Sequence, residues 1–157
     1  MGACHRNATR HFLGAITDVC SVVMTTQEVE CWGLKRTLEW FDTLKHYNVI
    51  LEKDCKPVVD DVNKNKLNLF EYDVILQECK TLFSYHNKFV FARRQANDST
   101  HALARVALSS ASRNVFDSIP HYIVTIIINE MPFCLSKRKY LPPPDQTKRQ
   151  RNHEFEV

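Results

Sequence analysis

The sequence lacks the apolar stretches that would direct it into a membrane or a secretory pathway. Its most apolar run, Tyr122 to Ile128, is far shorter than the roughly 20 residues that cross a bilayer. The first residues are basic and contain histidines, without the continuous apolar segment of a secretory signal. These absences predict a protein of the nucleus or cytoplasm that is not secreted and has no membrane partner.

The sequence also lacks paired cysteines and the arrangements typical of zinc sites or nucleophilic catalysis. Its six cysteines form no C-x-x-C pair, and a disulfide framework would be expected in a shorter, loop-rich secreted chain. We therefore expect reduced thiols, no zinc site and no small-molecule cofactor. No Ser/His/Asp or Cys/His arrangement is evident. All histidines except His101 show no ligand spacing and are interpreted as surface residues: His5, His11, His46, His86, His121 and His153.

Charge and composition change along the chain. The formal net charge of +3 over 157 residues weakly favours a polyanionic partner. After Met131 the sequence becomes rich in proline and basic residues, with Leu141-Pro-Pro-Pro144 followed by Lys148-Arg-Gln-Arg151. Such a segment has little apolar surface to bury. We therefore predict one domain over residues 1–131 and a basic, disordered tail over residues 132–157.

Capping signals and hydrophobic spacing predict alternating strands and helices. Thr25 and Glu28 form a capping-box pattern, and apolar residues at spacings of three and four follow it to about Lys45. Gly33 inside this helix costs about 1 kcal/mol relative to alanine, so we expect it to serve close packing. The predicted strands cover residues 12–23 (as one strand or two), 49–51 and 88–93. The other predicted helices cover residues 57–62, 70–84, 97–110 (with Asn97 as the cap) and 119–131. This alternation predicts an α/β fold with a mixed, partly parallel sheet flanked by helices.

Two acidic residues lie where a sheet would bring them to one edge. Glu30 lies in the first turns of the long helix, and Asp54 follows the strand at residues 49–51. Sheets of this class place ligands at the carboxyl ends of their strands, and Mg²⁺ binds a few carboxylates together with substrate phosphate. A simpler reading stays open, because the helix macrodipole favours an acid in a first turn and an acid after a strand often caps the next helix.

Four segments along the chain carry family patterns. They are Thr26–Trp40 (TQEVECWGLKRTLEW), Asn48–Asp60 (NVILEKDCKPVVD), Phe89–Arg105 (FVFARRQANDSTHALAR) and Val115–Pro120 (VFDSIP). In this order they resemble type 1 ribonuclease H (RNase H) domains, in particular the reverse-transcriptase-like branch that is abundant in plants and occurs in non-LTR retroelements. The resemblance covers about Gly2 to Met131. It implies an RNase H-like fold and a nucleic-acid partner, the RNA–DNA hybrid.

The same resemblance implies a site in which four acids hold two Mg²⁺ ions and the RNA strand of the hybrid is cut. Glu30 matches the family's glutamate and Asp54 its second aspartate, so both are predicted metal ligands. His101 takes the place of the last aspartate; it is a poor Mg²⁺ ligand but can shuttle a proton. The first aspartate lies on the family's central first strand, which we expect this chain to lack, since Gly2–Asn7 resembles the end of the second strand and its turn. Either the sheet pairs differently without that strand, or the chain is a fragment of a longer gene product. We therefore expect Mg²⁺ binding that is weak or absent.

Other residues bear on nucleic-acid binding. Arg93 and Arg94 follow the last predicted strand, where they would either contact phosphates or form a solvated strand end. Three aromatic residues of the long helix could stack on bases, although helical spacing favours the core: Trp32, Trp40 and Phe41. Three hypotheses follow. The chain is a Mg²⁺-dependent endonuclease with Glu30, Asp54 and His101 as catalytic residues, a catalytically inactive remnant that binds nucleic acid, or a protein-interaction module.

Overall fold

The computed structural model describes residues 1–46, 49–64, 71–83, 88–93, 97–110 and 112–133. Arg94, His86 and the predicted basic tail from residue 134 onward lie outside the described residues. The elements in chain order are β1 (Gly2–Arg6), β2 (Phe12–Thr17), α1 (Thr26–Thr43), β3 (Ile50–Lys53), α2 (Lys56–Asn63), α3 (Glu71–Phe83), β4 (Lys88–Phe91), α4 (Asp98–Ala107), β5 (Asn114–Phe116), the 3₁₀ helix η2 (His121–Ile123) and α5 (Val124–Phe133). Within the part of the chain that the structure describes, none of the helices is long and apolar enough to span a membrane.

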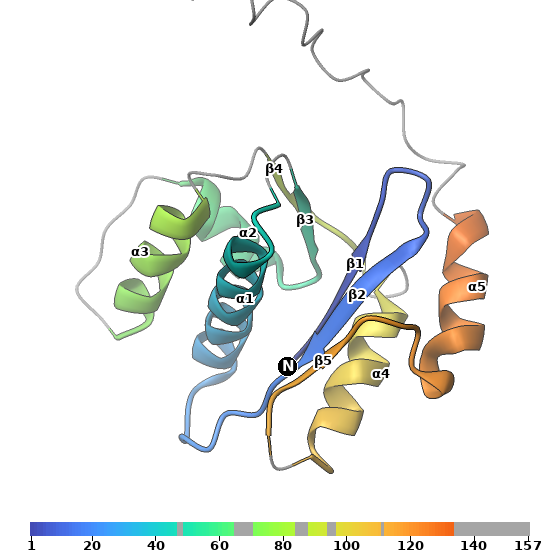
Figure 1. The fold of residues 1–157 in the computed structure, drawn as a ribbon. Helices are drawn as coiled ribbons and strands as arrows, with labels where there is room; N and C mark the ends of the chain where they lie inside the picture. Colours follow the sequence, from blue (N-terminus) through green and yellow to red (C-terminus); the bar gives the residue numbers. More distant parts are fainter. Residues whose placement is uncertain (47–48, 65–70, 84–87, 94–96, 111, 134–157) are drawn as a thin grey trace, which may run out of the picture.

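The strands form two separate sheets (Figure 1). The first is three-stranded and antiparallel, with β2 between β1 and β5. The second consists of β3 and β4, which pair in parallel and place Leu51 opposite Phe89. The parallel pair confirms the predicted parallel strand pairing, but the single mixed sheet that the sequence predicted is divided into an antiparallel and a parallel sheet among the described residues. The short strand β5 was not predicted from hydrophobic pattern, because it contains only three residues and its Val115 is half exposed.

The predicted capping box starts α1. The Thr25 hydroxyl accepts a hydrogen bond from the Glu28 N–H at 3.3 Å, and the Glu28 carboxylate accepts one from the Thr25 N–H at 2.6 Å. These bonds satisfy backbone donors that have no partner inside the first turn. The helix ends at Thr43, and Lys45 then adopts a φ of 53°. This left-handed backbone stops an α-helix, as the predicted end near Lys45 anticipates.

One face of α1 packs on the main core. This core joins α1 to both sheets and to α2 and α3, with buried residues that include Ile16, Leu34, Leu38, Leu51, Val58, Leu76 and Phe89. Trp40 and Phe41 are 3% and 4% exposed, so they belong to this core and are not a base-stacking platform. Trp32 is only half-buried. Gly33 serves the expected close packing, since a Cβ there would lie 3.3 Å from the Cβ of Met1.

A second core lies on the opposite face of the three-stranded sheet, under α4, η2 and α5. Its buried residues are Ala15, Leu103, Ile123 and Ile127. On β2, a Cβ at Gly14 would lie 3.3 Å from the Trp40 ring of α1, whereas the next residue, Ala15, belongs to the second core. The three-stranded sheet is therefore a middle layer between α1 and the pair α4 and α5, as Figure 1 shows.

β1 alternates between these two faces and corrects one expectation from the sequence. His5 was interpreted as a surface residue, but it is only 9% exposed, and its ring lies edge-on to Phe41 with centroids 4.9 Å apart. Strand alternation explains this, because Ala3 and His5 point to the α1 side while Cys4 and Arg6 point to the other side. A polar residue in a short strand can thus be part of the core.

Helix α4 is held very close to β1. A Cβ at Gly2 would lie 2.5 Å from the Thr100 carbonyl oxygen and 2.7 Å from the Ala104 nitrogen, so only glycine allows this approach. The predicted cap of α4 is corrected by the structure, since Asn97 is at the cap position but makes no side-chain capping bond. Instead the Glu130 carboxylate, from α5, accepts the Ser99 N–H at 2.7 Å.

Candidate functional site

Glu30, the first predicted metal ligand, forms an ion pair with a lysine of the neighbouring sheet. It lies in the second turn of α1, and its Oε2 accepts a hydrogen bond from Lys53 Nζ at 2.5 Å. Lys53 is the last residue of β3. The lysine side chain is 16% exposed and the glutamate side chain 38% exposed. Because the pair is partly shielded from water, the ammonium compensates the carboxylate charge more strongly than at an open surface.

Asp54, the second predicted ligand, contacts the predicted His101 directly. Asp54 follows β3, and His101 lies in the first turns of α4. The His101 Nε2 and the Asp54 Oδ2 are 2.9 Å apart, with side-chain exposures of 27% and 17%. The imidazole N–H donates to the carboxylate in this bond. The structure therefore brings together two residues that are 47 positions apart in the sequence.

The two pairs meet at the carboxyl end of the parallel sheet. Lys53 and Asp54 are consecutive, so one short backbone segment joins the Glu30 pair to the His101 pair. The chain after β4 stays at the same edge, because the Ala92 N–H donates to the Lys53 carbonyl oxygen at 2.9 Å. Arg93 is the next residue, and its side chain is exposed. Arg94 lies outside the described residues.

The arrangement does not offer an obvious magnesium site. Among the residues that the structure describes, no three His, Cys, Asp or Glu side chains come together to hold a metal ion. Mg²⁺ prefers several oxygen ligands in octahedral geometry. Here one predicted ligand is bonded to a lysine ammonium and the other to an imidazole N–H. As they are arranged, these residues do not fit Mg²⁺, since each would have to leave its present partner.

Comparison with known protein families identifies a family for most of this chain. The model of the family described as reverse transcriptase-like matches residues 1–107. The chain belongs to the reverse transcriptase-like family. No curated protein and no solved structure matches the chain. The family is RNase H-like, in agreement with the mixed α/β architecture and with the resemblance seen in the sequence.

The match to the reverse transcriptase-like family ends with helix α4. The match includes the pair Glu30 and Lys53, the pair Asp54 and His101, and Arg93. It ends at Ala107, the last residue of α4. The segment Val115–Pro120, which also carried the sequence resemblance, lies beyond the matched residues and forms β5 and the turn after it. The family match therefore supports the part of the domain that holds the candidate site.

Lys53 is the residue of the candidate site in this reverse transcriptase-like domain that the sequence analysis did not identify. It stands between two acids, Glu52 and Asp54, which makes the segment read as acidic. The signal that could have found it is strand alternation. Lys53 lies two residues after the buried Leu51, so both side chains point to the face that α1 covers. Glu30 is on that helix.

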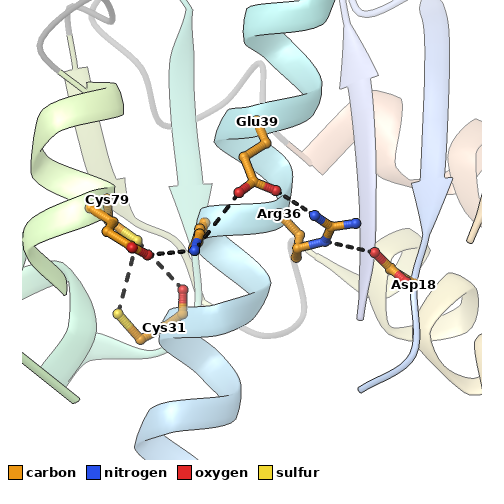
Figure 2. A network of polar contacts seen from close by, with 7 residues as sticks. Asp18, Cys31, Arg36, Glu39 and Cys79 are labelled. Carbon is orange, nitrogen blue, oxygen red and sulfur yellow. Dashed lines mark hydrogen bonds and ion pairs between the residues drawn. The ribbon is translucent and has the colours of Figure 1, made fainter. Parts of the chain in front are cut away.

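A second polar cluster of the domain lies between α1 and the segment after β2 (Figure 2). Arg36 donates from Nε to Asp18 at 2.8 Å and from a terminal nitrogen to Glu39 at 2.5 Å. The hydrogen bond with Asp18 raises the pKa of Arg36. A shallow hollow of about 290 Å³ adjoins the cluster, lined by Asp18, Val19, Cys20, Ser21, Trp32, Lys35, Arg36 and Glu39. The two cations of this hollow are both paired with acids, Lys35 with Glu78 and Arg36 with Asp18. The hollow is therefore a poorer phosphate site than the edge of the parallel sheet, which also carries the exposed Arg93.

Proposed function

We propose that this RNase H-like domain binds nucleic acid, with RNA–DNA hybrids as its preferred duplex, and that it cleaves the hybrid weakly or not at all. The observation that carries the proposal is the pairing of both predicted metal ligands, Glu30 with Lys53 and Asp54 with His101. We also propose that the domain works in the nucleus or cytoplasm, where nucleic acids are present. The net charge of +3 favours binding of such a polyanionic partner.

Charge compensation makes the carboxyl end of β3 suitable for a phosphate backbone without a metal. Unpaired carboxylates repel phosphate, and in a hydrolase of this kind the metal ions remove that repulsion. In this chain Lys53 compensates Glu30, and His101 donates a hydrogen bond to Asp54. The exposed Arg93 at the same edge adds positive charge. The edge can therefore approach a nucleic-acid backbone through side chains alone.

Hydrolysis has weaker support than binding. Cleavage by two metals requires ions about 4 Å apart that hold both the attacking and the leaving oxygen. The described residues supply two of the four acids that the family resemblance implies, and both have other partners. We infer that Mg²⁺ binds weakly at this edge.

The division of the strands into two sheets leaves outer strands beside the candidate site. β1 is an outer strand of the antiparallel sheet and β3 an outer strand of the parallel one. Within the described ranges no hydrogen-bonded ladder joins the two sheets. Among the described residues, no strand therefore pairs with the outer edge of β1 or with that of β3.

Salt-dependent binding tests the proposal. The affinity for a fluorescent RNA–DNA hybrid, measured by anisotropy at several salt concentrations, should fall linearly on a log–log plot because binding releases counterions. Arg93→Gln should weaken binding and reduce the magnitude of the slope by about one, as expected for one lost phosphate contact. Arg113→Gln is the matched control, since Arg113 is also exposed but precedes β5 of the other sheet. A salt-independent affinity, or equal effects of both substitutions, would contradict binding at this edge.

A cleavage assay separates binding from hydrolysis. We expect a labelled hybrid incubated with the protein and Mg²⁺ or Mn²⁺ to remain intact over a time in which binding is saturated. Asp54→Asn should also leave the hybrid intact and should not weaken binding, because it removes a negative charge beside the phosphates while the amide oxygen still accepts the His101 N–H. Metal-dependent cleavage that Asp54→Asn abolishes would overturn the proposal that this domain binds the hybrid without cleaving it.

One observation favours weak hydrolysis as the second candidate. A carboxylate that accepts a hydrogen bond from an imidazole orients the ring, and such a ring can move a proton near neutral pH. Asp54 and His101 have this geometry at 2.9 Å. If the assay shows cleavage, His101→Ala should reduce the rate more than the affinity, whereas a purely structural role would change both together.

A further inference from the structure

The core contains two thiols that face each other across a helix pair. Cys31 lies on α1 and Cys79 on α3, 48 positions apart in the sequence, with their sulfur atoms 4.0 Å apart (Figure 2). The Cys79 thiol also lies 3.6 Å from the Cys31 carbonyl oxygen, to which it donates. Both residues are fully buried, with 0% exposure. Neither is used by the proposed nucleic-acid site.

The geometry is close to that of a disulfide. A disulfide bond is about 2.05 Å long, so the sulfur atoms need to approach by roughly 2 Å. Side-chain rotation with a small movement of the helices can supply this. The helices are already held together at this level, because Lys35 of α1 forms an ion pair with Glu78, the residue before Cys79. Among the cysteines that the structure describes, these two have their thiols in mutual contact.

The contact between the two thiols supplies the second sulfur that an oxidised cysteine needs to form a disulfide. The Cys79 thiol donates its proton to the Cys31 carbonyl oxygen, and the two sulfur atoms lie against each other. Whichever of the two cysteines is oxidised first, its partner is therefore placed to react with it afterwards.

We propose that Cys31 and Cys79 form a disulfide that fastens α1 to α3 when the protein meets hydrogen peroxide, a two-electron oxidant small enough to enter a transiently opened core. One of the two cysteines, as its thiolate, attacks a peroxide oxygen, the O–O bond breaks, and a sulfenic acid and hydroxide form, the latter taking up the proton that the thiol has lost to become water. The sulfur of the other cysteine then attacks the sulfenic sulfur, the S–O bond breaks, and hydroxide leaves with the proton of that second cysteine as a second water. Two thiols are oxidised and one peroxide is reduced to two waters.

Peptide mapping without reductant tests the inference directly. After a graded peroxide treatment of the full chain, we expect a cross-linked peptide pair containing Cys31 and Cys79 that has lost two hydrogens and separates on reduction. The oxidised protein should melt roughly 5–10 °C higher than the reduced protein, because the bond closes a long loop of the unfolded chain. Cys79→Ala should abolish both the cross-link and the shift.

Cys20→Ala is the matched control, because Cys20 lies in the half-buried segment after β2 and should not affect either readout. The inference is overturned if Cys20 is oxidised while Cys31 and Cys79 stay reduced. It is also overturned if Cys31 is recovered as a sulfinic acid or linked to a different cysteine. If Cys79→Ala does not fold, the wild-type peptide map alone decides, since it reports the bond without any substitution.

Discussion

His5 shows how a single buried side chain makes the stability of this domain depend on pH. Burial lowers its pKa, and the ring of His46, whose centroid lies 4.9 Å away, lowers it further. An unfolded histidine has a pKa of about 6.5. As the pH falls below that value, the unfolded chain binds a proton that the folded chain still refuses. The free energy of unfolding therefore decreases between pH 6.5 and the lower folded-state pKa, and does not change further below it on account of His5.

The prediction for His5 is a change of slope in a pH series. Replacement by phenylalanine, which suits a site beside Trp40 and Phe41, should flatten the loss of stability between pH 6.5 and 5. The slope attributable to one such histidine is at most about 1.4 kcal/mol per pH unit. Urea denaturation at each pH measures it. His121→Gln, at an exposed position, should keep the wild-type slope, and an unchanged slope in His5→Phe would assign the pH dependence to other groups.

Single residues also show why the candidate site could be predicted only in part. Asp54 was recognisable because a proline-started helix follows a short apolar strand, and His101 because it occupies a family position. Their contact at 2.9 Å agrees with the expected common edge. The pairing of Glu30 with Lys53 depends on how α1 packs on β3. No local sequence pattern encodes this packing, so the sequence did not predict that the Glu30 carboxylate is paired with a lysine.

At the scale of elements, α4 packs on β1 at Gly2 without room for a side chain. A Cβ there would lie 2.5 Å from a carbonyl oxygen, 2.6 Å from the Leu103 Cβ and 2.7 Å from a backbone nitrogen. Backbone atoms of a helix cannot move alone, so Gly2→Ala should push α4 away as a unit. We expect a cost of about 1–3 kcal/mol in the free energy of unfolding, typical of overpacking.

Gly33→Ala is the matched control for Gly2→Ala. Its new Cβ would lie 3.3 Å from the Cβ of Met1, the side chain at the chain's start. Replacing a helix-interior glycine by alanine gains up to about 1 kcal/mol, so this variant should be neutral or more stable. Urea midpoints of both variants against the wild type give the answer. Equal destabilisation by both would show that the fit at Gly2 is not unusually tight.

Elements differed in how far their sequence revealed them. The helix α1 was predictable because it is long, amphipathic and opened by a capping box. The strands β1 and β5 were not found from pattern, since each is short and has few apolar residues, and they owe their conformation to hydrogen bonds with β2. The start of α4 was predicted at the right position but for the wrong reason, because its N–H group is satisfied from α5 and not by Asn97.

At the scale of the whole molecule, the two sheets are connected by helices and side chains and, within the described residues, by no shared ladder. β2 has hydrogen-bonded neighbours on both sides, whereas β3 and β4 form an isolated pair of four-residue strands. Local opening costs least where few backbone bonds and contacts must break. Hydrogen exchange should therefore protect the amides of β2 more than those of β3 and β4. Equal protection in both sheets would mean that the helices make them one cooperative unit.

The ion pair between Arg6 and Glu130 has a consequence for where this folding unit ends. Glu130 lies on α5, and it both pairs with Arg6 of β1 and accepts the Ser99 N–H in the first turn of α4. The family match stops at Ala107, well before α5. A chain shortened to the matched segment would leave the half-buried Arg6 guanidinium without its carboxylate and would uncover Ala15 and Leu103. The segment that matches the family is therefore smaller than the set of elements that pack together in this fold, and substitutions at positions 6 and 130 are expected to constrain each other across this boundary.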